Sequence, residues 1–302
     1  MQTVLVTGGT GLIGQNLSQL LTEKGYKVIH LSRKRNLQAT FPAYQWDIPK
    51  GHIDKEALQQ ADFIITLAGA GVADRRWSSA RKKLIIDSRV NGILLIKKHL
   101  QELNISPKAI IGASAIGFYG NSGAAVVNEA TKAGTGFLSE SVIAWENAYK
   151  AFDELKIDLT VLRVGIVLST KGGALQKMLP TYKAGFGTYF GNGGQVYSWI
   201  HIDDICRIFC HLLKQKAGGV FNGVSPNPVS NKELAKAIAV AKNMNEVVFP
   251  APAFVMKTVL GEMSSVVLDG SNVSSKKIEQ ANFQFKHPEL VPALKDLLKR
   301  KI

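Results

Sequence analysis

The sequence predicts an α/β protein in which helices cover both faces of a parallel β-sheet. Three observations lead to this class. Short runs rich in Val and Ile alternate with helix-length segments. The runs are apolar throughout, as strands buried on both faces are. The chain of 302 residues is long enough for one large or two medium domains with a substantial core.

The first half of the chain supplies most of these elements, with strands and helices in turn. The residues between strands show apolar positions at helical spacing, which predicts helices that pack on the sheet. The expected strands are residues 3–6, 27–31, 63–67, 109–113 and 159–162, and the expected long helices are residues 12–23, 78–102 and 136–154.

The pattern changes after Leu168. Gly and Pro are frequent between residues 172 and 194, which predicts loops over a site. Strand and helix signals return at residues 196–213, and residues 250–292 are rich in loops with short helices. We therefore expect a smaller C-terminal substrate domain interleaved with the first. The expected division is residues 1–168, rejoined by 196–222, for the larger domain, and residues 169–195 and 223–302 for the smaller one.

A glycine-rich loop follows the first strand and opens the first helix, in the sequence TGGTGLIG at residues 7–14. Gly8 and Gly11 permit a tight turn, and Gly14 lets the helix pack near the strand. Free amides at the helix start would then face a pyrophosphate. This context predicts a doubly wound Rossmann fold that binds a dinucleotide. The expected contacts here are Gly8, Thr10, Gly11, Leu12 and Ile13.

The end of the second strand indicates which dinucleotide is bound. An NAD site usually places an acidic residue there for the ribose 2′-hydroxyl, yet no acid occurs between Glu23 and Asp47. Ser32 and Arg33 would instead hold a 2′-phosphate, which predicts NADP. The alternative is that this basic segment is simply an exposed turn. Asp47 is expected either to face the adenine amine or to cap a turn.

These residues resemble an extended short-chain dehydrogenase/reductase, the class of sugar-nucleotide epimerases and dehydratases, over essentially the whole chain. The chain resembles one atypical subgroup of that class more closely, the epimerase-family proteins, which are sometimes labelled cell-division inhibitors. This closer resemblance extends to the subgroup's C-terminal domain of unknown function. The segments that carry the resemblance are residues 67–69, 75–77, 88–90, 114–120, 145–146, 163–165, 172–175, 198–204, 260–262 and 283–285. The resemblance implies further cofactor contacts from Leu67, Ala68, Gly69, Arg89, Ser114 and Arg163.

The sequence departs from that family at its catalytic pair. The family uses Tyr-x-x-x-Lys on the helix after the serine segment, where the ammonium lowers the pKa of the tyrosine. Here Trp145 stands in place of the tyrosine, Tyr149 in place of the lysine, and Lys150 lies about 100° around the helix. The remaining catalytic candidates are Ser114, Tyr119 and His201. For each of them a packing or backbone-bonding role is the alternative, and Glu129 and Glu146 are further candidate acids or bases.

Composition excludes several other classes. The formal charge of +14 comes from scattered lysines and fits a basic surface or a phosphate-bearing ligand, and no basic helix or zinc spacing supports nucleic-acid binding. No apolar run approaches the ~20 residues of a membrane span, and no signal segment precedes the first strand. Two cysteines fit a reducing, cytoplasmic setting, and we expect them in the core. We expect no metal site, since metal-ligand spacing is absent.

Two functions remain open at this point. The first is an NADP-dependent oxidoreductase or epimerase that acts on a small carbonyl or nucleotide-sugar substrate. Arg75, Arg76, Arg89 and Arg163 would suit a phosphate or carboxylate on that substrate. The second is a protein without catalytic activity that binds NADP(H) and senses its redox state, which the missing Tyr–Lys pair favours. We expect Asp203 or Asp204 to cap a helix over residues 205–213.

Overall fold

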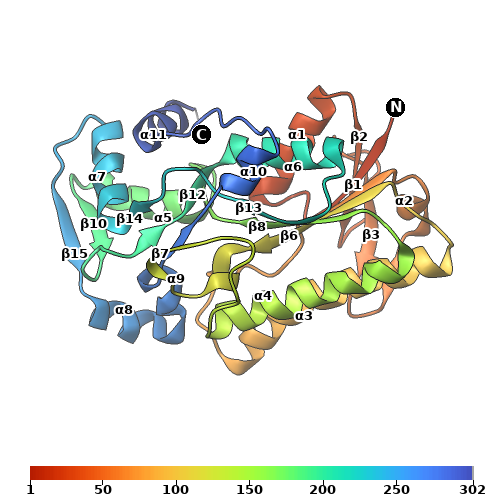
Figure 1. The fold of residues 1–302 in the computed structure, drawn as a ribbon, viewed down its shortest axis with the longest axis horizontal. Helices are drawn as coiled ribbons and strands as arrows, with labels where there is room; N and C mark the ends of the chain where they lie inside the picture. The colour runs from red at the N-terminus through yellow and green to blue at the C-terminus, as the bar shows by residue number, and fades with distance from the viewer. Residues whose placement is uncertain (301–302) are drawn as a thin grey trace.

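An eight-stranded sheet crosses the centre of the molecule in this computed structural model, which describes residues 1–300 (Figure 1). The strand order is β13-β8-β6-β5-β1-β2-β3-β4, and all neighbours pair in parallel except β3 and β4. The strands are β1 (Thr3–Thr7), β2 (Lys27–Ser32), β3 (Ala43–Asp47), β4 (His52–Ile53), β5 (Phe63–Thr66), β6 (Ala109–Ala115), β8 (Leu159–Val164) and β13 (Gly219–Gly223). All five strands expected in the first half of the chain are present, which confirms the predicted fold class.

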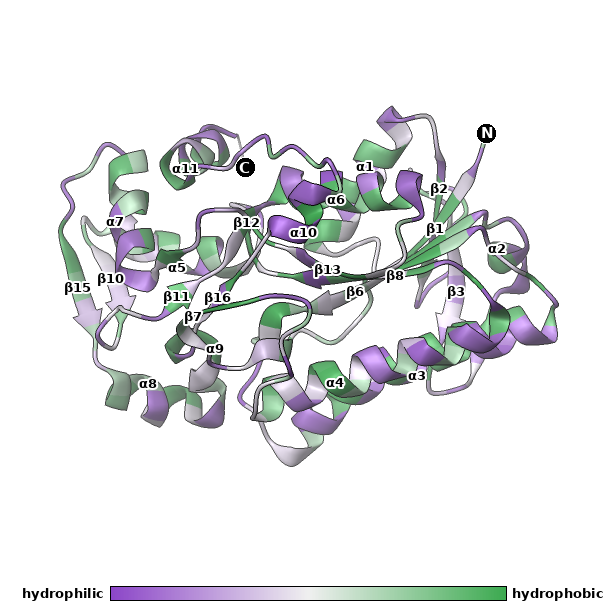
Figure 2. Ribbon diagram, in the orientation of Figure 1, coloured by the Kyte–Doolittle hydropathy of each residue, from purple (hydrophilic) through white to green (hydrophobic). Residues whose placement is uncertain are grey.

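Helices cover both faces of the sheet, as Figure 1 shows: α1 and α6 lie on one face and α3 and α4 on the other. Figure 2 shows apolar residues gathered on the central strands, while α3 carries many hydrophilic ones. The larger helices are α1 (Leu12–Glu23), α3 (Ser79–Glu102), α4 (Phe137–Tyr149), α5 (Gly173–Lys183), α6 (Ile202–Gln215), α7 (Asn231–Ala241), α8 (Ala253–Leu260) and α11 (Leu290–Lys299). The helix expected at residues 136–154 ends at Tyr149 and continues as the 3₁₀ segment η2 (Lys150–Leu155).

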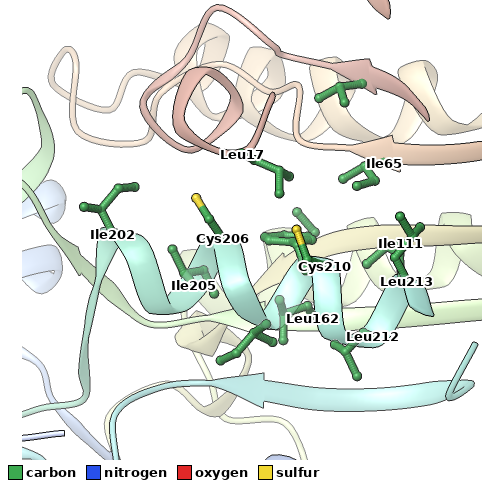
Figure 3. Close-up of a cluster of buried hydrophobic side chains, with 14 of the residues drawn as sticks. Leu17, Ile65, Ile111, Leu162, Ile202, Ile205, Cys206, Cys210, Leu212 and Leu213 are labelled. Atoms are coloured by element: carbon green, nitrogen blue, oxygen red, sulfur yellow. The ribbon is translucent and has the colours of Figure 1, made fainter. Parts of the chain in front are cut away.

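Both cysteines lie in the core, as expected. Cys206 and Cys210 project from α6 toward Leu17 of α1 (Figure 3). Burial raises the pKa of both thiols far above their ordinary value, so they stay protonated and act as small apolar groups. Among the described residues, no helix is both long and apolar enough to cross a bilayer.

The remaining elements form a smaller region beside the carboxyl ends of the strands (Figure 1). It contains four two-stranded pairs, β10–β15, β11–β14, β12–β9 and β16–β7. Their bounds are β7 (Gly123–Val127), β9 (Ile166–Leu168), β10 (Gly187–Phe190), β11 (Val196–Tyr197), β12 (Trp199–His201), β14 (Val229–Ser230), β15 (Val248–Ala251) and β16 (Ser271–Val273). Short helices complete it: η1 (Ile116–Tyr119), η3 (Gly261–Ser264) and α9 (Ser265–Leu268). Helix α10 (Lys276–Gln280) packs on β13 of the central sheet, and α2 (Lys55–Gln59) contacts β2. The predicted domain boundaries stay a prediction.

The expectation of loops over residues 172–194 was wrong. Helix α5 and strand β10 occupy most of this segment. Leu175, Met178 and Tyr182 form the buried face of α5, at spacings of three and four residues. The glycines of this segment lie at the ends of these elements and not within them.

Candidate functional site

The glycine-rich loop bridges β1 and α1 at the point where the strand order reverses between β1 and β5. Gly8 has a φ of +69°, a conformation that favours glycine, and its carbonyl accepts a hydrogen bond from the Gly11 amide at 2.9 Å. Gly11 is the N-cap of α1 and brings no capping side chain. The amides that open α1 therefore keep their donors available for an anion.

Two glycines of the loop touch backbone or a ring so closely that no larger side chain fits. A Cβ on Gly14 would lie 2.7 Å from the Gly9 Cα and closer still to the Gly8 carbonyl oxygen. A Cβ on Gly9 would enter the ring of His30. The loop is thus held flat against the end of β1, as a pyrophosphate cradle requires.

Thr7 joins this loop to the end of β5, a role that the sequence analysis did not find. Its Oγ1 accepts hydrogen bonds from the amides of Leu67 and Ala68, both at 3.1 Å. A Cβ on Gly8 would lie 2.9 Å from the Ala68 nitrogen, so the two strand ends are in close contact. Leu67, Ala68 and the glycine loop form one wall, consistent with their expected roles, which stay predictions.

The basic turn after β2 contains one arginine that is paired and one that is not. Arg35 Nη1 binds Asp54 at 2.6 Å and its Nη2 binds Glu56 at 3.0 Å. The Arg33 side chain is exposed and has no acidic partner among residues 1–300, and Ser32 is half-buried beside it. Asp47 accepts a hydrogen bond from the Lys50 amide at 3.2 Å, the turn-capping alternative. Of these two arginines, only Arg35 is engaged by acidic side chains of the described residues.

The two helix positions where the family carries its Tyr–Lys pair are both buried. Arg89 stacks over the Trp145 ring at 4.8 Å and donates Nη1 to the Ala70 and Ile85 carbonyls. Tyr149 OH bonds Thr66 Oγ1 at 2.6 Å and donates to the Ala113 carbonyl at 2.9 Å. Burial raises the pKa of Tyr149. This phenol is part of the protein interior and is not placed to give a proton to a substrate.

A chain of polar side chains lies at the ends of the paired strands β6 and β8. Ser114 Oγ donates to Glu146 Oε1 at 2.6 Å. Arg163, which pairs in register with Ser114, holds Glu146 with two bonds, from Nε at 2.8 Å and Nη2 at 2.7 Å. Arg163 is 4% exposed and so faces Glu146 inside the protein, where the resemblance had implied a cofactor contact. The geometry is that of a hydroxyl beside a fixed carboxylate acceptor.

Tyr119 belongs to the same network and is buried. Its OH donates to Asn222 Oδ1 at 2.8 Å and accepts from Arg163 Nη1 at 3.0 Å. Burial raises the pKa of Tyr119 above its ordinary value. The hydroxyls of Tyr119 and Ser114 are thus both engaged within this network, and the two residues are 4% and 2% exposed. The sequence could not link Asn222 to this network, because 103 residues separate it from Tyr119.

His201 caps α6, which begins at Ile202 and not at residue 205, and this corrects the expectation that Asp203 or Asp204 would do so. The Asp203 amide donates to His201 Nδ1 at 3.0 Å. The proton of neutral His201 therefore lies on Nε2, which faces Asp296 Oδ2 at 3.3 Å. His287 stacks on His201 at 3.8 Å, and Arg300 binds both Asp203 and Asp296.

This cluster contains the residue types that bind metal ions. The hydrogen bonds that these residues already make show whether they are available to do so. Oxygen and nitrogen atoms of His201, Asp203, His287 and Asp296 lie within 4.8 Å of one another. A histidine ligand must offer a lone pair, but Nδ1 of His201 accepts the backbone amide and Nε2 carries the proton. The Arg300 guanidinium already forms ion pairs with both carboxylates. We interpret the cluster as a set of contacts that holds α6 and α11 together.

Two buried histidines predict a pH dependence of stability. Burial lowers the pKa of both His30 and His201 from 6.5 to about 4. The unfolded chain takes up these protons below about pH 6.5, and the folded chain does so only near pH 4. The free energy of unfolding should therefore fall as the pH drops through this window, by up to roughly 1.4 kcal/mol per pH unit for each histidine. Urea unfolding of the wild type, His30→Gln and the exposed-site control His52→Gln tests this. The slope should be shallower in His30→Gln alone, and an unchanged slope there would contradict the assignment.

A cavity of about 160 Å³ opens between the start of α4 and the α9–β16 segment. Its walls come from residues 116, 117, 120, 135–138, 166, 196–198, 265, 266 and 269–271. Ile116 and Gly117 directly follow β6, so the cavity adjoins the strand end that carries Ser114. Neither Trp145 nor residues 172–194 line it.

The Rossmann sheet and the glycine cradle define an NAD(P)-binding fold, and comparison with known proteins agrees. The chain belongs to the NAD dependent epimerase/dehydratase family, whose model matches residues 4–223. A second model, described as a domain of unknown function, matches residues 251–297. The resemblance stated from the sequence is therefore confirmed.

Several relatives are similar over their whole length. The human epimerase family protein SDR39U1, solved with NADPH, is 30% identical with a TM-score of 0.88, covering 99% of this chain and 100% of that one. An epimerase family protein from Mycobacterium bovis is 32% identical over 96% of both chains. One from Staphylococcus aureus is 33% identical over 99% of this chain and 100% of its own.

Proposed function

We propose that this protein is an NADP(H)-dependent oxidoreductase or epimerase that acts on a small carbonyl or nucleotide-sugar substrate. One observation carries the proposal: the uncapped start of α1 and the Ser114–Glu146–Arg163 chain lie at the same edge of one sheet. In open α/β sheets this edge is where cofactor and substrate meet. Family membership and the NADPH-bound human relative support the choice of cofactor class.

The preference for NADP(H) over NAD(H) rests on Arg33. A charge-assisted bond to the 2′-phosphate contributes roughly 1.5–3 kcal/mol, or about ten- to a hundredfold in affinity. Arg33→Ala should therefore weaken NADPH binding by about that factor and leave NADH binding unchanged, as measured by titration calorimetry.

Arg35→Ala is the matched control, because it removes the same charge from an arginine that already binds Asp54 and Glu56. It should change NADPH affinity by less than about threefold. Equal affinities of the wild type for NADPH and NADH would overturn the proposed preference.

Ser114, Glu146 and Arg163 would handle the proton. NADP(H), when bound, supplies or accepts the hydride at the substrate carbon. In the oxidising direction the substrate hydroxyl proton passes to Ser114 Oγ while the proton of Ser114 moves to Glu146 Oε1. Reduction reverses both transfers. Arg163 holds the Glu146 carboxyl group in position with two hydrogen bonds. This relay would replace the missing Tyr–Lys pair.

Nicotinamide oxidation with a panel of carbonyl and nucleotide-sugar substrates tests the activity. Steady turnover supports the enzyme. Tight NADPH binding without turnover on any member would favour the redox sensor, which the burial of Trp145 and Tyr149 suits.

A further inference from the structure

The cavity beside α9 contains one carboxylate and no Lys, Arg or His in its walls. That carboxylate belongs to Asp269, directly after α9. Among residues 1–300, the Asp269 carboxylate accepts no hydrogen bond and pairs with no cation within ion-pair distance. Partial burial raises the pKa of Asp269, and Lys257 of α8 acts in the opposite direction. The carboxylate oxygens stay open to the cavity, where they can accept hydrogen bonds from water or from a ligand that enters it.

The other polar side chains around Asp269 are mostly engaged within the protein. Tyr197 OH donates to the Val267 carbonyl at 2.7 Å. Ser198 Oγ donates to the Ser271 carbonyl at 2.7 Å, and Ser265 Oγ to the Glu262 carbonyl at 2.9 Å. These hydroxyls already donate their protons to backbone carbonyls. The cavity therefore presents a carboxylate acceptor that no described side chain engages, and a ligand that displaces the water there should bring donors.

We propose that Asp269 binds neighbouring hydroxyl groups of an uncharged, sugar-like part of the substrate, and that the cavity rejects a carboxylate or phosphate there. This inference rests on the proposed function, which places the substrate at this strand edge. Two carboxylate oxygens can accept from two adjacent hydroxyls at once. The volume of about 160 Å³ suits a group of about one ring and lies below the ~300–1,000 Å³ of sites for whole drug-sized ligands.

The sequence led us to expect a phosphate or carboxylate on the substrate, and the proposal restricts where on the protein that group could bind. A phosphate or carboxylate placed against Asp269 would face a like charge in a partly desolvated site. Arg75 and Arg76, both exposed and outside the walls of this cavity, are the residues that suit an anion elsewhere on the substrate. The neutral and charged ends of the substrate would thus be recognised separately.

The test uses two simple probes, methyl β-D-glucopyranoside and methyl β-D-glucuronide, titrated into the NADP⁺-loaded full-length protein by ligand-observed NMR. The glucoside should bind at least tenfold more tightly than the glucuronide. Asp269→Asn removes the charge and nearly preserves shape, and it should weaken glucoside binding by about tenfold and bring the two affinities within about twofold. Its affinity for NADPH should stay unchanged.

Glu262→Gln is the control, since Glu262 pairs with Lys82 and lies outside the cavity walls. It should leave both probe affinities as in the wild type. The proposal is overturned if the wild type shows no saturable glucoside binding, or if Asp269→Asn binds both probes as the wild type does. Loss of NADPH binding or of hydride transfer would instead count against the proposed function, while the Asp269-dependent selectivity could persist.

Discussion

Gly14→Val should abolish NADPH binding. The Cβ alone would lie 2.7 Å from the Gly9 Cα and nearer to the Gly8 carbonyl, and both neighbours are backbone that cannot move aside without opening the loop. The loop must then leave the end of β1, and the amides that open α1 lose their alignment with the pyrophosphate. Calorimetric titration should detect no binding at NADPH concentrations that saturate the wild type.

Gln15→Val is the control for the loss of helix stability that a β-branched residue causes, because Gln15 is the exposed neighbour of Gly14 on the same helix. It should fold and bind NADPH with nearly wild-type affinity. If Gly14→Val folds, as judged by circular dichroism, and binds NADPH equally well, the glycine loop is not the cofactor site.

Ser114→Ala should lower turnover by roughly 10²–10⁴, the usual contribution of general acid–base catalysis. The substitution removes the hydroxyl between substrate and Glu146 and leaves the Arg163–Glu146 pair in place. NADPH affinity should change little. A solvent deuterium isotope effect on turnover, expected in the wild type, should be absent from any residual activity.

Glu146→Gln should cause a loss of similar size, and it should also destabilise the fold, because the buried Arg163 then lacks its counter-charge. Glu140→Gln, an exposed site on the same helix, is the control and should retain full turnover. Brisk turnover by both Ser114→Ala and Glu146→Gln would mean that another group handles the proton.

Local signals in the sequence correctly predicted the strand, the glycine turn and the helix of the proposed cofactor side. The loop at residues 7–14 and the strand before it are adjacent in the chain, so their geometry follows from residue types alone. The replacement of the family's catalytic pair by Trp145 and Tyr149 on α4 is likewise visible in the local sequence alone. The sequence could not show that Tyr149 is tied to Thr66, which lies 83 residues away on another strand.

The proposed substrate side depends on contacts between distant segments, which the sequence could not show. Asp269 enters the cavity only because the α9–β16 segment packs against η1, and it carries no motif. His201 was named as a catalytic candidate, but the sequence could not show that its ring stacks on His287 and faces Asp296. Helix α5 could have been found, since Leu175, Met178 and Tyr182 repeat at helical spacing between the glycines that masked it.

Deuterium transfer tests the central claim most directly. NADPH labelled at the reactive nicotinamide carbon is incubated with the protein and the panel of carbonyl and nucleotide-sugar substrates, and the products are analysed by mass spectrometry. We expect deuterium in at least one product, at a rate that falls by roughly 10²–10⁴ in Ser114→Ala. Tight NADPH binding with no deuterium transferred to any substrate would contradict the enzyme and identify the protein as a binder of the cofactor alone.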